Sequence, residues 1–290
     1  MYHYVRDKDE DLSNLKALSI EKFERQLDYL QRNYSIISWP GLRDFLMSDK
    51  KLPDNPCLLT FDDGLKDGYI NVYPRLKERG ISGLFFPLAR SPAEGLALVH
   101  LLQLVLAKTN EQEFRELFLN ELASAERELF EGYCKQSERE YPPDKFGEHT
   151  LRNMRRAITI YMPDKSFPVL RKLFGKLIGD DMAMASEFYL QKNEIEEMID
   201  GGMFFGGHGA KHFRFSKIPV EDQRVEVEGS AKFLENLHPA PWAFAYPYGD
   251  YNDQSFQLLK NNNFIGAFST EEKEIHNNVY GIGRVDTVSI

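Results

Sequence analysis

Cysteine is scarce in this sequence, whose 290 residues include only Cys57 and Cys134. Two thiols so far apart in the chain cannot build a disulfide framework or a cysteine metal site on their own. Long apolar runs are missing as well. No uninterrupted run reaches the ~18 residues that span a bilayer, and the first residues lack the apolar region of a secretion signal. We therefore expect a cytoplasmic protein with no transmembrane segment.

Positive charge is in deficit, because 36 Lys and Arg residues face 45 Asp and Glu residues and give a formal net charge of -9. Such a chain repels a phosphate backbone on average, and no basic stripe with interleaved aromatic residues is visible. Nucleic acid is therefore excluded as a partner. The hydrophobic fraction of 42% and the charged fraction of 28% are typical of a soluble globular protein with a substantial core.

Patterns typical of strands and helices alternate at both ends of the chain. Apolar runs that suit buried strands occur at 57–61, 83–86, 203–205, 242–246 and 265–268. Repeated strand–helix units predict a mainly parallel sheet covered by helices, either open or closed into a barrel. In both arrangements, functional side chains gather at the C-terminal ends of the strands.

Residues 93–190 differ from the rest, because strand patterns vanish there and helical periodicity dominates, beginning with Leu98, Leu101, Leu102 and Val105. We predict a single domain over residues 1–290 that carries 93–190 as a helical insertion. The insertion is a candidate for a lid or for a surface through which a homo-oligomer forms.

Two carboxylates, Asp62 and Asp63, follow directly after the run 57–61 and precede Gly64. The side chains of consecutive residues diverge in an extended chain, so one carboxylate could bind a metal ion while the other faces a substrate. Asp-Asp-Gly also suits an ordinary turn or helix cap, and the pair taken alone favours that structural interpretation.

Two histidines, His208 and His212, follow the apolar run 203–205. At the spacing i, i+4 they share one face if the segment is helical, and they can then close on one ion. The glycines around His208 let backbone approach a ligand closely. A structural or merely exposed role is the alternative for each histidine.

The aspartate pair and the histidine pair explain each other chemically. Two histidines and one carboxylate leave an open position for water on Zn²⁺ or a similar divalent ion. Such an ion lowers the pKa of bound water and polarises a carbonyl, and a second carboxylate beside it can take the proton from the water. Together the two pairs predict a hydrolytic metal site.

Three segments resemble the motifs of the polysaccharide deacetylases, the NodB-homology family or carbohydrate esterase family 4. Residues 60–64, Thr-Phe-Asp-Asp-Gly, are similar to the first motif. Residues 208–212 resemble the second motif, which is histidine, serine or threonine, two residues and histidine. Residues 245–249 resemble the third motif, usually arginine, any residue, proline, tyrosine and glycine. The resemblance covers roughly residues 1–92 and 191–290 and does not reach the helical insertion.

The resemblance implies an α/β fold, a distorted (β/α) barrel with fewer than eight strands. It implies that Asp62 is the catalytic base. It also implies three ligands for a divalent metal, with Zn²⁺ as the leading candidate and Co²⁺ or Ni²⁺ as alternatives: Asp63, His208 and His212. The backbone amide of Tyr248 would join the metal in stabilising the oxyanion.

Two motif positions depart from the family. Gly209 stands where the family has serine or threonine, which removes a hydroxyl that could support the loop. Ala245 replaces the motif arginine that normally holds the base in place. We hypothesise that Arg284 supplies that charge instead, and a surface salt bridge with Asp286 is the alternative for this arginine.

The general acid of the family, usually a histidine on a late leucine-rich strand, has no match after Tyr248. Residues 1–3, Met-Tyr-His, resemble the start of circularly permuted relatives, the matrix poly-N-acetylglucosamine deacetylases, in which this element comes first. His3 is therefore the candidate acid that protonates the departing amine. A frayed terminus is the alternative.

These features predict a metal-dependent hydrolase that removes an N-acetyl group from a sugar or oligosaccharide and releases acetate. The expected cytoplasmic location favours a nucleotide-linked or lipid-linked precursor of cell-surface glycan synthesis as substrate. Two alternatives stay open. One is a catalytically degenerate member of the family that binds a glycan or a partner, and the other is a metal hydrolase of a non-sugar amide or ester.

Overall fold

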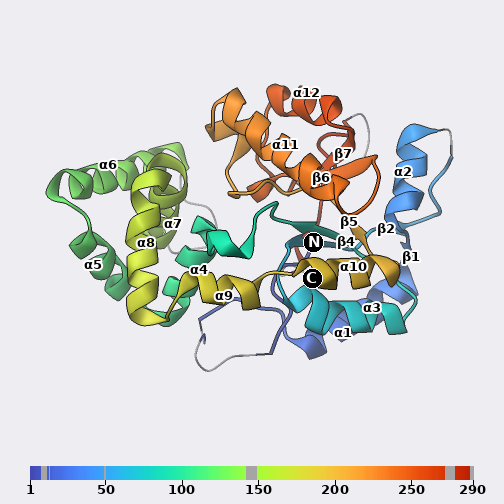
Figure 1. Cartoon of the computed structure of the whole chain (residues 1–290), viewed down its shortest axis with the longest axis horizontal. Coiled ribbons are helices and arrows are strands. Elements are labelled where there is room, and N and C mark those ends of the chain that lie inside the picture. Colours follow the sequence, from blue (N-terminus) through green and yellow to red (C-terminus); the bar gives the residue numbers. More distant parts are fainter. Residues whose placement is uncertain (8–11, 13, 49, 142–148, 272–277, 288–290) are drawn as a thin grey trace. The chain divides into compact units, whose positions relative to one another are not determined.

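The computed structural model describes residues 1–7, 12, 14–48, 50–141, 149–271 and 278–287 (Figure 1). The chain forms two compact units. The first comprises Met1–Lys8, Lys16–Ser91 and Ser186–Ile290, and the second comprises Asp9–Leu15 and Pro92–Ala185. All strands of the described residues lie in the first unit.

The first unit is built on short parallel strands. They are β1 (Ser35–Ile36), β2 (Pro56–Cys57), β3 (Thr60–Asp63), β4 (Leu84–Pro87), β5 (Phe204–Phe205), β6 (Trp242–Ala245) and β7 (Phe264–Phe268). They pair in the orders β1-β2, β3-β4-β5 and β6-β7, and each of these pairs is parallel. The predicted α/β class with a parallel sheet is confirmed.

Single bridges extend these sheets beyond the strands. Three parallel bridges join Tyr2 to Phe61, Gly207 to Phe244, and Phe268 to Ile282. The segment after β5 pairs with β6, because Gly207 N donates to Ala243 O (2.9 Å) and Ala245 N donates to Gly207 O (2.8 Å). The predicted barrel with fewer than eight strands stays a prediction, because the strand pairs by themselves form separate sheets.

Helices alternate with these strands along the first unit. They are α1 (Ile20–Asn33), α2 (Trp39–Met47), α3 (Tyr73–Glu78), α10 (Lys192–Asp200), α11 (Val220–Glu235) and α12 (Asp253–Asn261), with short turns at Gly68–Val72, Phe215–Lys217 and Pro247–Gly249. Helix α1 illustrates how sequence sets an element. The Ser19 side chain accepts a hydrogen bond from Lys22 N (3.3 Å), and Phe23, Leu27 and Leu30 bury one face of the helix.

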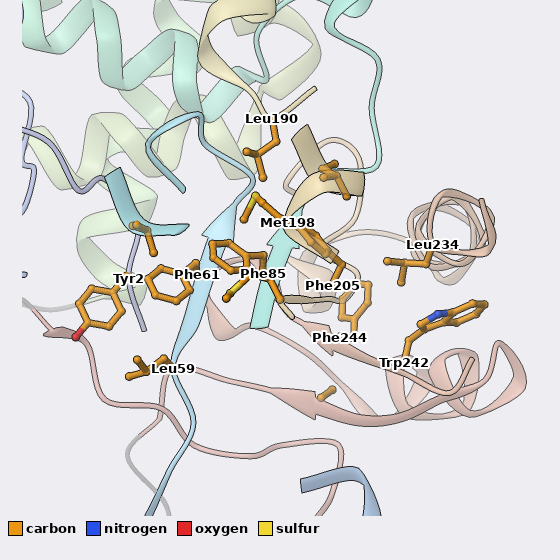
Figure 2. Packing of buried hydrophobic residues seen from close by; sticks show 14 of the residues in the cluster. Tyr2, Leu59, Phe61, Phe85, Leu190, Met198, Phe205, Leu234, Trp242 and Phe244 are labelled. Carbon is orange, nitrogen blue, oxygen red and sulfur yellow. The ribbon is translucent and has the colours of Figure 1, made fainter. Parts of the chain in front are cut away.

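A ladder of aromatic rings sets the register of the central strands (Figure 2). Phe61, Phe85 and Phe205 are register partners on β3, β4 and β5, and their rings stack at centroid distances of 4.6 and 5.6 Å. Tyr2 extends the ladder, with its ring 5.1 Å from Phe61. Burial of each such side chain contributes about 1.5–3 kcal/mol. Because side chains alternate along a strand, the ladder turns Asp62 to the opposite face of β3.

The second unit is helical. Its helices are α4 (Leu98–Lys108), α5 (Glu111–Glu121), α6 (Ser124–Glu140), α7 (His149–Arg156), α8 (Pro163–Leu177) and most of α9 (Asp181–Phe188), with short turns at Pro92–Glu94 and Ala157–Tyr161. Figure 1 draws these helices in green to yellow. The single domain predicted over residues 1–290, with an insertion at 93–190 and a homo-oligomer contact through it, stays a prediction. Among the described residues, no helix combines the length and apolar character needed to cross a membrane.

Candidate metal centre and active site

Asp62 and Asp63 lie at the C-terminal end of β3, and both are buried, with 4% and 3% of their surface exposed. The strand ends because Asp63 and Gly64 both adopt positive φ, +68° and +65°. Only glycine fits the second position, since a Cβ there would lie 2.6 Å from the Cβ of Pro87 on β4. The two carboxylates are therefore the last residues of β3, and the buried turn begins directly after them at Gly64.

His208 and His212 come together on an irregular loop after β5. The condition under which the i, i+4 spacing would put both on one helix face is not met, because Gly209 and His212 have φ of +71° and +59° and the segment is not helical. The physical reason lies in the backbone donors between the histidines. The N–H groups of Gly209, Ala210 and Lys211 donate to side chains and not to carbonyls one helical turn earlier.

Asp63, His208 and His212 form a compact cluster whose ligand atoms all lie within 4.8 Å of one another. The Asp63 Oδ1 atom is 3.4 Å from Nε2 of His208 and 3.3 Å from Nε2 of His212. The Nδ1 atom of His208 lies 2.6 Å from Ala245 O, so Nδ1 carries the proton and the Nε2 lone pair faces the cluster. Two imidazoles and one carboxylate fit a divalent ion with an open position.

The surroundings of the cluster favour positive charge. Burial opposes protonation of His208, but the adjacent carboxylate of Asp63 and the charge of Asp62 outweigh burial and raise its pKa. The negative charge of Asp62 and Asp63 would attract a metal ion in the same way, because two buried carboxylates stabilise a metal cation as they stabilise a protonated imidazole.

Asp62 is held by a buried arginine from the far end of the chain. Arg284 donates from Nη1 to Oδ1 (2.7 Å) and from Nη2 to Oδ2 (2.8 Å), and its Nε donates to Ser269 O (3.1 Å). Its guanidinium also lies 5.9 Å from the ring centres of both Phe86 and Phe268. Arg284 is 7% exposed, so it is not the surface residue that the alternative interpretation assumed.

The arginine controls the charge of Asp62. Burial raises the pKa of Asp62, but the positive charge of Arg284 and its hydrogen bonds, together with His208 and His3, lower the pKa to about 2. Asp62 is therefore ionised at neutral pH, with both oxygens engaged by one rigid fork.

His3 lies at the edge of the same site. Tyr2 N donates to Thr60 O (2.8 Å) and Asp62 N donates to Tyr2 O (2.9 Å), so the first residues pair with β3 and are not frayed. This pairing brings His3 Nε2 to 3.9 Å from Asp62 Oδ2, with the His3 side chain 38% exposed. His3 thus adjoins Asp62 on the solvent side.

Tyr248 lies beside the histidines in the turn Pro247–Gly249. It has a φ of +60°, and its ring meets that of His212 edge to face at 4.6 Å. The guanidinium of Arg214 lies 4.1 Å from the centre of the Tyr248 ring. Thr270 Oγ1 donates to Tyr248 O (3.3 Å), which ties the turn to the segment after β7.

Sequence reasoning missed Arg214 and two residues of α11, Glu226 and Ser230. A usable signal was present in the helix. Glu226 and Ser230 are four residues apart and share the buried face of α11 with Val227, Ala231 and Leu234. Two polar residues at helical spacing among apolar ones indicate a specific buried partner, which here is the loop that carries the histidines.

The family described as polysaccharide deacetylase matches residues 169–266, which include both histidines and Tyr248 but not the aspartate pair. A curated relative, the poly-β-1,6-N-acetyl-D-glucosamine N-deacetylase of Staphylococcus epidermidis, is 30% identical over 135 residues, 40% of this chain and 46% of that protein. YxkH of Bacillus subtilis is 29% identical over 115 residues, 37% of this chain and 39% of that protein. The chain thus spans less than half the length of these curated relatives.

Solved structures share the fold over nearly the whole chain. The Streptococcus pyogenes deacetylase PplD superposes with a TM-score of 0.61 at 17% identity, covering 98% of this chain and 89% of that one. IcaB from Ammonifex degensii superposes with a TM-score of 0.57 at 19% identity, covering 99% and 91%.

Proposed function

Because the chain belongs to the polysaccharide deacetylase family, we propose that it hydrolyses the N-acetyl group of a saccharide and releases acetate. The observation that carries the proposal is the buried cluster of Asp63, His208 and His212 with the Arg284-bound carboxylate of Asp62 beside it. A hydrolase of this kind needs a cation site and an adjacent ionised base, and the cluster supplies groups suited to both.

We also infer that the first unit closes into a distorted barrel with fewer than eight strands. Support comes from the two ends of the chain, where Tyr2 extends the sheet at β3 by bridging Phe61 and Ile282 extends the sheet at β7 by bridging Phe268. Thr287 donates from N and Oγ1 to Met1 O, at 3.3 and 3.0 Å, so these two added segments are hydrogen-bonded to each other.

Asp63, His208 and His212 would hold the divalent ion, with Zn²⁺ favoured by two imidazoles and Co²⁺ or Ni²⁺ as alternatives. When bound, the ion supplies a Lewis acid that polarises the acetamide carbonyl and acidifies the attacking water. Hydrogen bonding of His208 to Ala245 O keeps its ring in the ligating tautomer (2.6 Å).

Asp62 acts as the general base in this proposal. A carboxylate with a pKa of about 2 is a weak base, so it serves by position and negative charge more than by proton affinity. Arg284 fixes both oxygens of that carboxylate and so takes over the role of the arginine absent at Ala245. The backbone N–H of Tyr248 would stabilise the oxyanion, and His3 would protonate the departing amine.

The substrate class follows from the relatives. The Staphylococcus epidermidis relative is named for N-deacetylation of poly-β-1,6-N-acetyl-D-glucosamine, so we infer that an N-acetylglucosamine unit is the group attacked here. A cytoplasmic, nucleotide-linked or lipid-linked precursor of surface glycan stays a prediction. A non-catalytic binding role loses support, because Arg284 compensates for Ala245 and Glu226 occupies the space beside Gly209.

Acetate release tests the proposal. The chain, loaded with Zn²⁺, Co²⁺ or Ni²⁺, would be offered β-1,6-linked N-acetylglucosamine oligomers, chitooligosaccharides, UDP-N-acetyl sugars and simple acetylated amides and esters. Release from saccharides alone supports the proposal. Release from simple amides or esters alone favours the non-sugar hydrolase, and release from none of them with a metal bound favours the binding role.

Asp63→Ala is expected to abolish the bound metal and acetate release together. Removing Asp63 leaves two histidines, one ligand short of the three protein ligands that a catalytic zinc site uses. Metal content after dialysis, measured by mass spectrometry beside circular dichroism, checks the prediction. Metal retained at wild-type stoichiometry would remove Asp63 from the ligand set.

His3→Ala is expected to flatten the basic limb of the pH–rate profile. A general acid must be protonated, so wild-type activity should fall as the pH rises through the pKa of that acid. Without His3, the slope of that limb should disappear and kcat at neutral pH should drop by about 10²–10⁴-fold. A variant that keeps the full basic limb would exclude His3 as the acid.

A further inference from the structure

The loop between the two histidines is held by one helix, α11. Gly209 N donates to Ser230 Oγ (3.0 Å), and Ala210 N and Lys211 N both donate to Glu226 Oε2, at 2.6 and 2.9 Å. Successive N–H groups that converge on one oxygen form a concave anion site, and here the anion is a side chain of the protein itself. Every backbone donor between the two histidines therefore ends on α11.

Ser230 and Glu226 are also tied to each other. Ser230 Oγ donates to Glu226 O (2.8 Å), which leaves the hydroxyl lone pairs for Gly209 N. Ser230 is fully buried and Glu226 is 2% exposed. Burial raises the pKa of Glu226 and outweighs the N–H groups of Lys211 and Ala210 and the charges of Lys211 and Arg90, which lower it. A carboxylate this deep is costly unless its partners are fixed, so the loop and the helix constrain each other.

Gly209 and Glu226 are complementary. Gly209 has a φ of +71°, and a Cβ at this position would lie 2.5 Å from Glu226 Oε2. The serine or threonine that the second motif usually carries is therefore incompatible with Glu226 in its present place. The departure at Gly209 is explained by a support that comes from outside the motif.

We propose that Glu226 and Ser230 are positioning residues of the metal site, which hold His208 and His212 in ligating geometry in place of the motif hydroxyl. The inference rests on the proposed metal-dependent function, since it assigns these residues to the loop that would carry two of the ligands. It adds to that function a set of residues on α11 on which metal affinity depends.

Zn²⁺ affinity of the full chain, measured by competition with a chelating dye, tests the proposal. Glu226→Ala removes the acceptor of two N–H groups and is expected to weaken Zn²⁺ binding by about 10–100-fold, the range for groups that orient metal ligands. Glu226→Gln keeps an amide oxygen for both donors and should restore most of the affinity. Glu228→Ala, an exposed glutamate on the same helix, is the matched control and should bind as wild type does.

A double-mutant cycle adds a second measurement. Gly209→Ser should weaken Zn²⁺ binding strongly in the wild-type background, because the new side chain meets Glu226. In the Glu226→Ala background the same change should cost less, since the space is then open and the serine hydroxyl can support the loop. Equal losses in both backgrounds would contradict the complementarity of the two residues.

The outcomes separate this proposal from the proposed function. A wild-type chain that binds none of Zn²⁺, Co²⁺ and Ni²⁺ and releases no acetate would overturn the function itself. Binding that is lost with Asp63→Ala but unchanged in Glu226→Ala would overturn only the positioning role. If Glu226→Ala does not fold, Ser230→Ala is measured in its place, together with hydrogen exchange of the amides 209–211 in the wild type. Wild-type Zn²⁺ affinity in Ser230→Ala and fast exchange of these amides would together refute the proposal.

Discussion

Asp62→Asn is expected to lower kcat for acetate release by about 10²–10⁴-fold while leaving metal affinity close to that of the wild type. The neighbouring change Asp63→Ala removes the metal as well. The two aspartates are adjacent in sequence, but only Asp63 Oδ1 is near the Nε2 atoms of both histidines, at 3.4 and 3.3 Å. Asp62 is bound on both oxygens by Arg284. Steady-state acetate release and metal content, measured on the same preparations, check the contrast.

The matched control is Asp67→Asn. Asp67 is 4% exposed and is paired with Arg6, which donates from Nε to Oδ2 (2.8 Å) and from Nη2 to Oδ1 (2.5 Å). Asp67→Asn therefore removes a buried carboxylate from a bidentate pair with arginine, as Asp62→Asn does, but outside the histidine cluster. Its kcat should stay near wild type. An Asp62→Asn enzyme that turned over as fast as Asp67→Asn would exclude Asp62 as the base.

Local sequence patterns predicted the parts of the site that lie at strand ends. The run 57–61 ends in Asp62 and Asp63, and the run 203–205 leads into His208, because strands buried on both faces are apolar and the polar residues that follow them lie at the sheet edge. The pairing of the two segments was beyond local patterns. It depends on β4, which joins β3 to β5 through the register of Phe61, Phe85 and Phe205.

Local patterns failed where the backbone leaves regular structure. The spacing of His208 and His212 would put both on one face of a helix, yet their separation is set by the positive φ values of Gly209 and His212 and by backbone N–H groups that donate to α11. No periodicity encodes such a loop, because its shape depends on Glu226, which lies far along the chain on another element. The family motif identified the loop but not its support.

In the proposed active site, Arg284 takes the place of the motif arginine. The arginine missing at Ala245 would have come from the end of β6, whereas Arg284 follows Ile282, which bridges β7. Ala245 belongs to the same buried cluster as Phe86 and Phe268, the two rings that the guanidinium of Arg284 contacts beside Asp62. A charge is needed at Asp62, and the parallel sheet offers more than one strand end from which to deliver it.

Arg284→Ala is expected to lower the free energy of unfolding at pH 7 by about 3–5 kcal/mol, because it leaves the carboxylate of Asp62 buried without its partner. The effect should depend on pH. A lowered pKa stabilises the fold above the unfolded pKa of ~3.9, and that stabilisation is lost only as the pH falls through the folded pKa. For Asp62 the folded value is about 2, so the stabilisation from Arg284 is fully present at pH 7. Denaturant titrations with a metal chelator present measure it.

Arg284→Ala should also lower kcat, and the cause of this loss differs from the cause of the loss in stability. Without the two hydrogen bonds from Arg284, the oxygens of Asp62 are no longer held in position for the proposed attacking water. A misplacement of about 1 Å costs about 10²-fold in kcat. Arg284→Lys should retain the charge but not the two parallel bonds, so stability should recover more than kcat does. Arg6→Ala, which breaks the pair with Asp67, is the control that should lose stability and keep kcat. If Arg284→Ala loses no more kcat than Arg6→Ala does, Arg284 stabilises the fold without orienting the base.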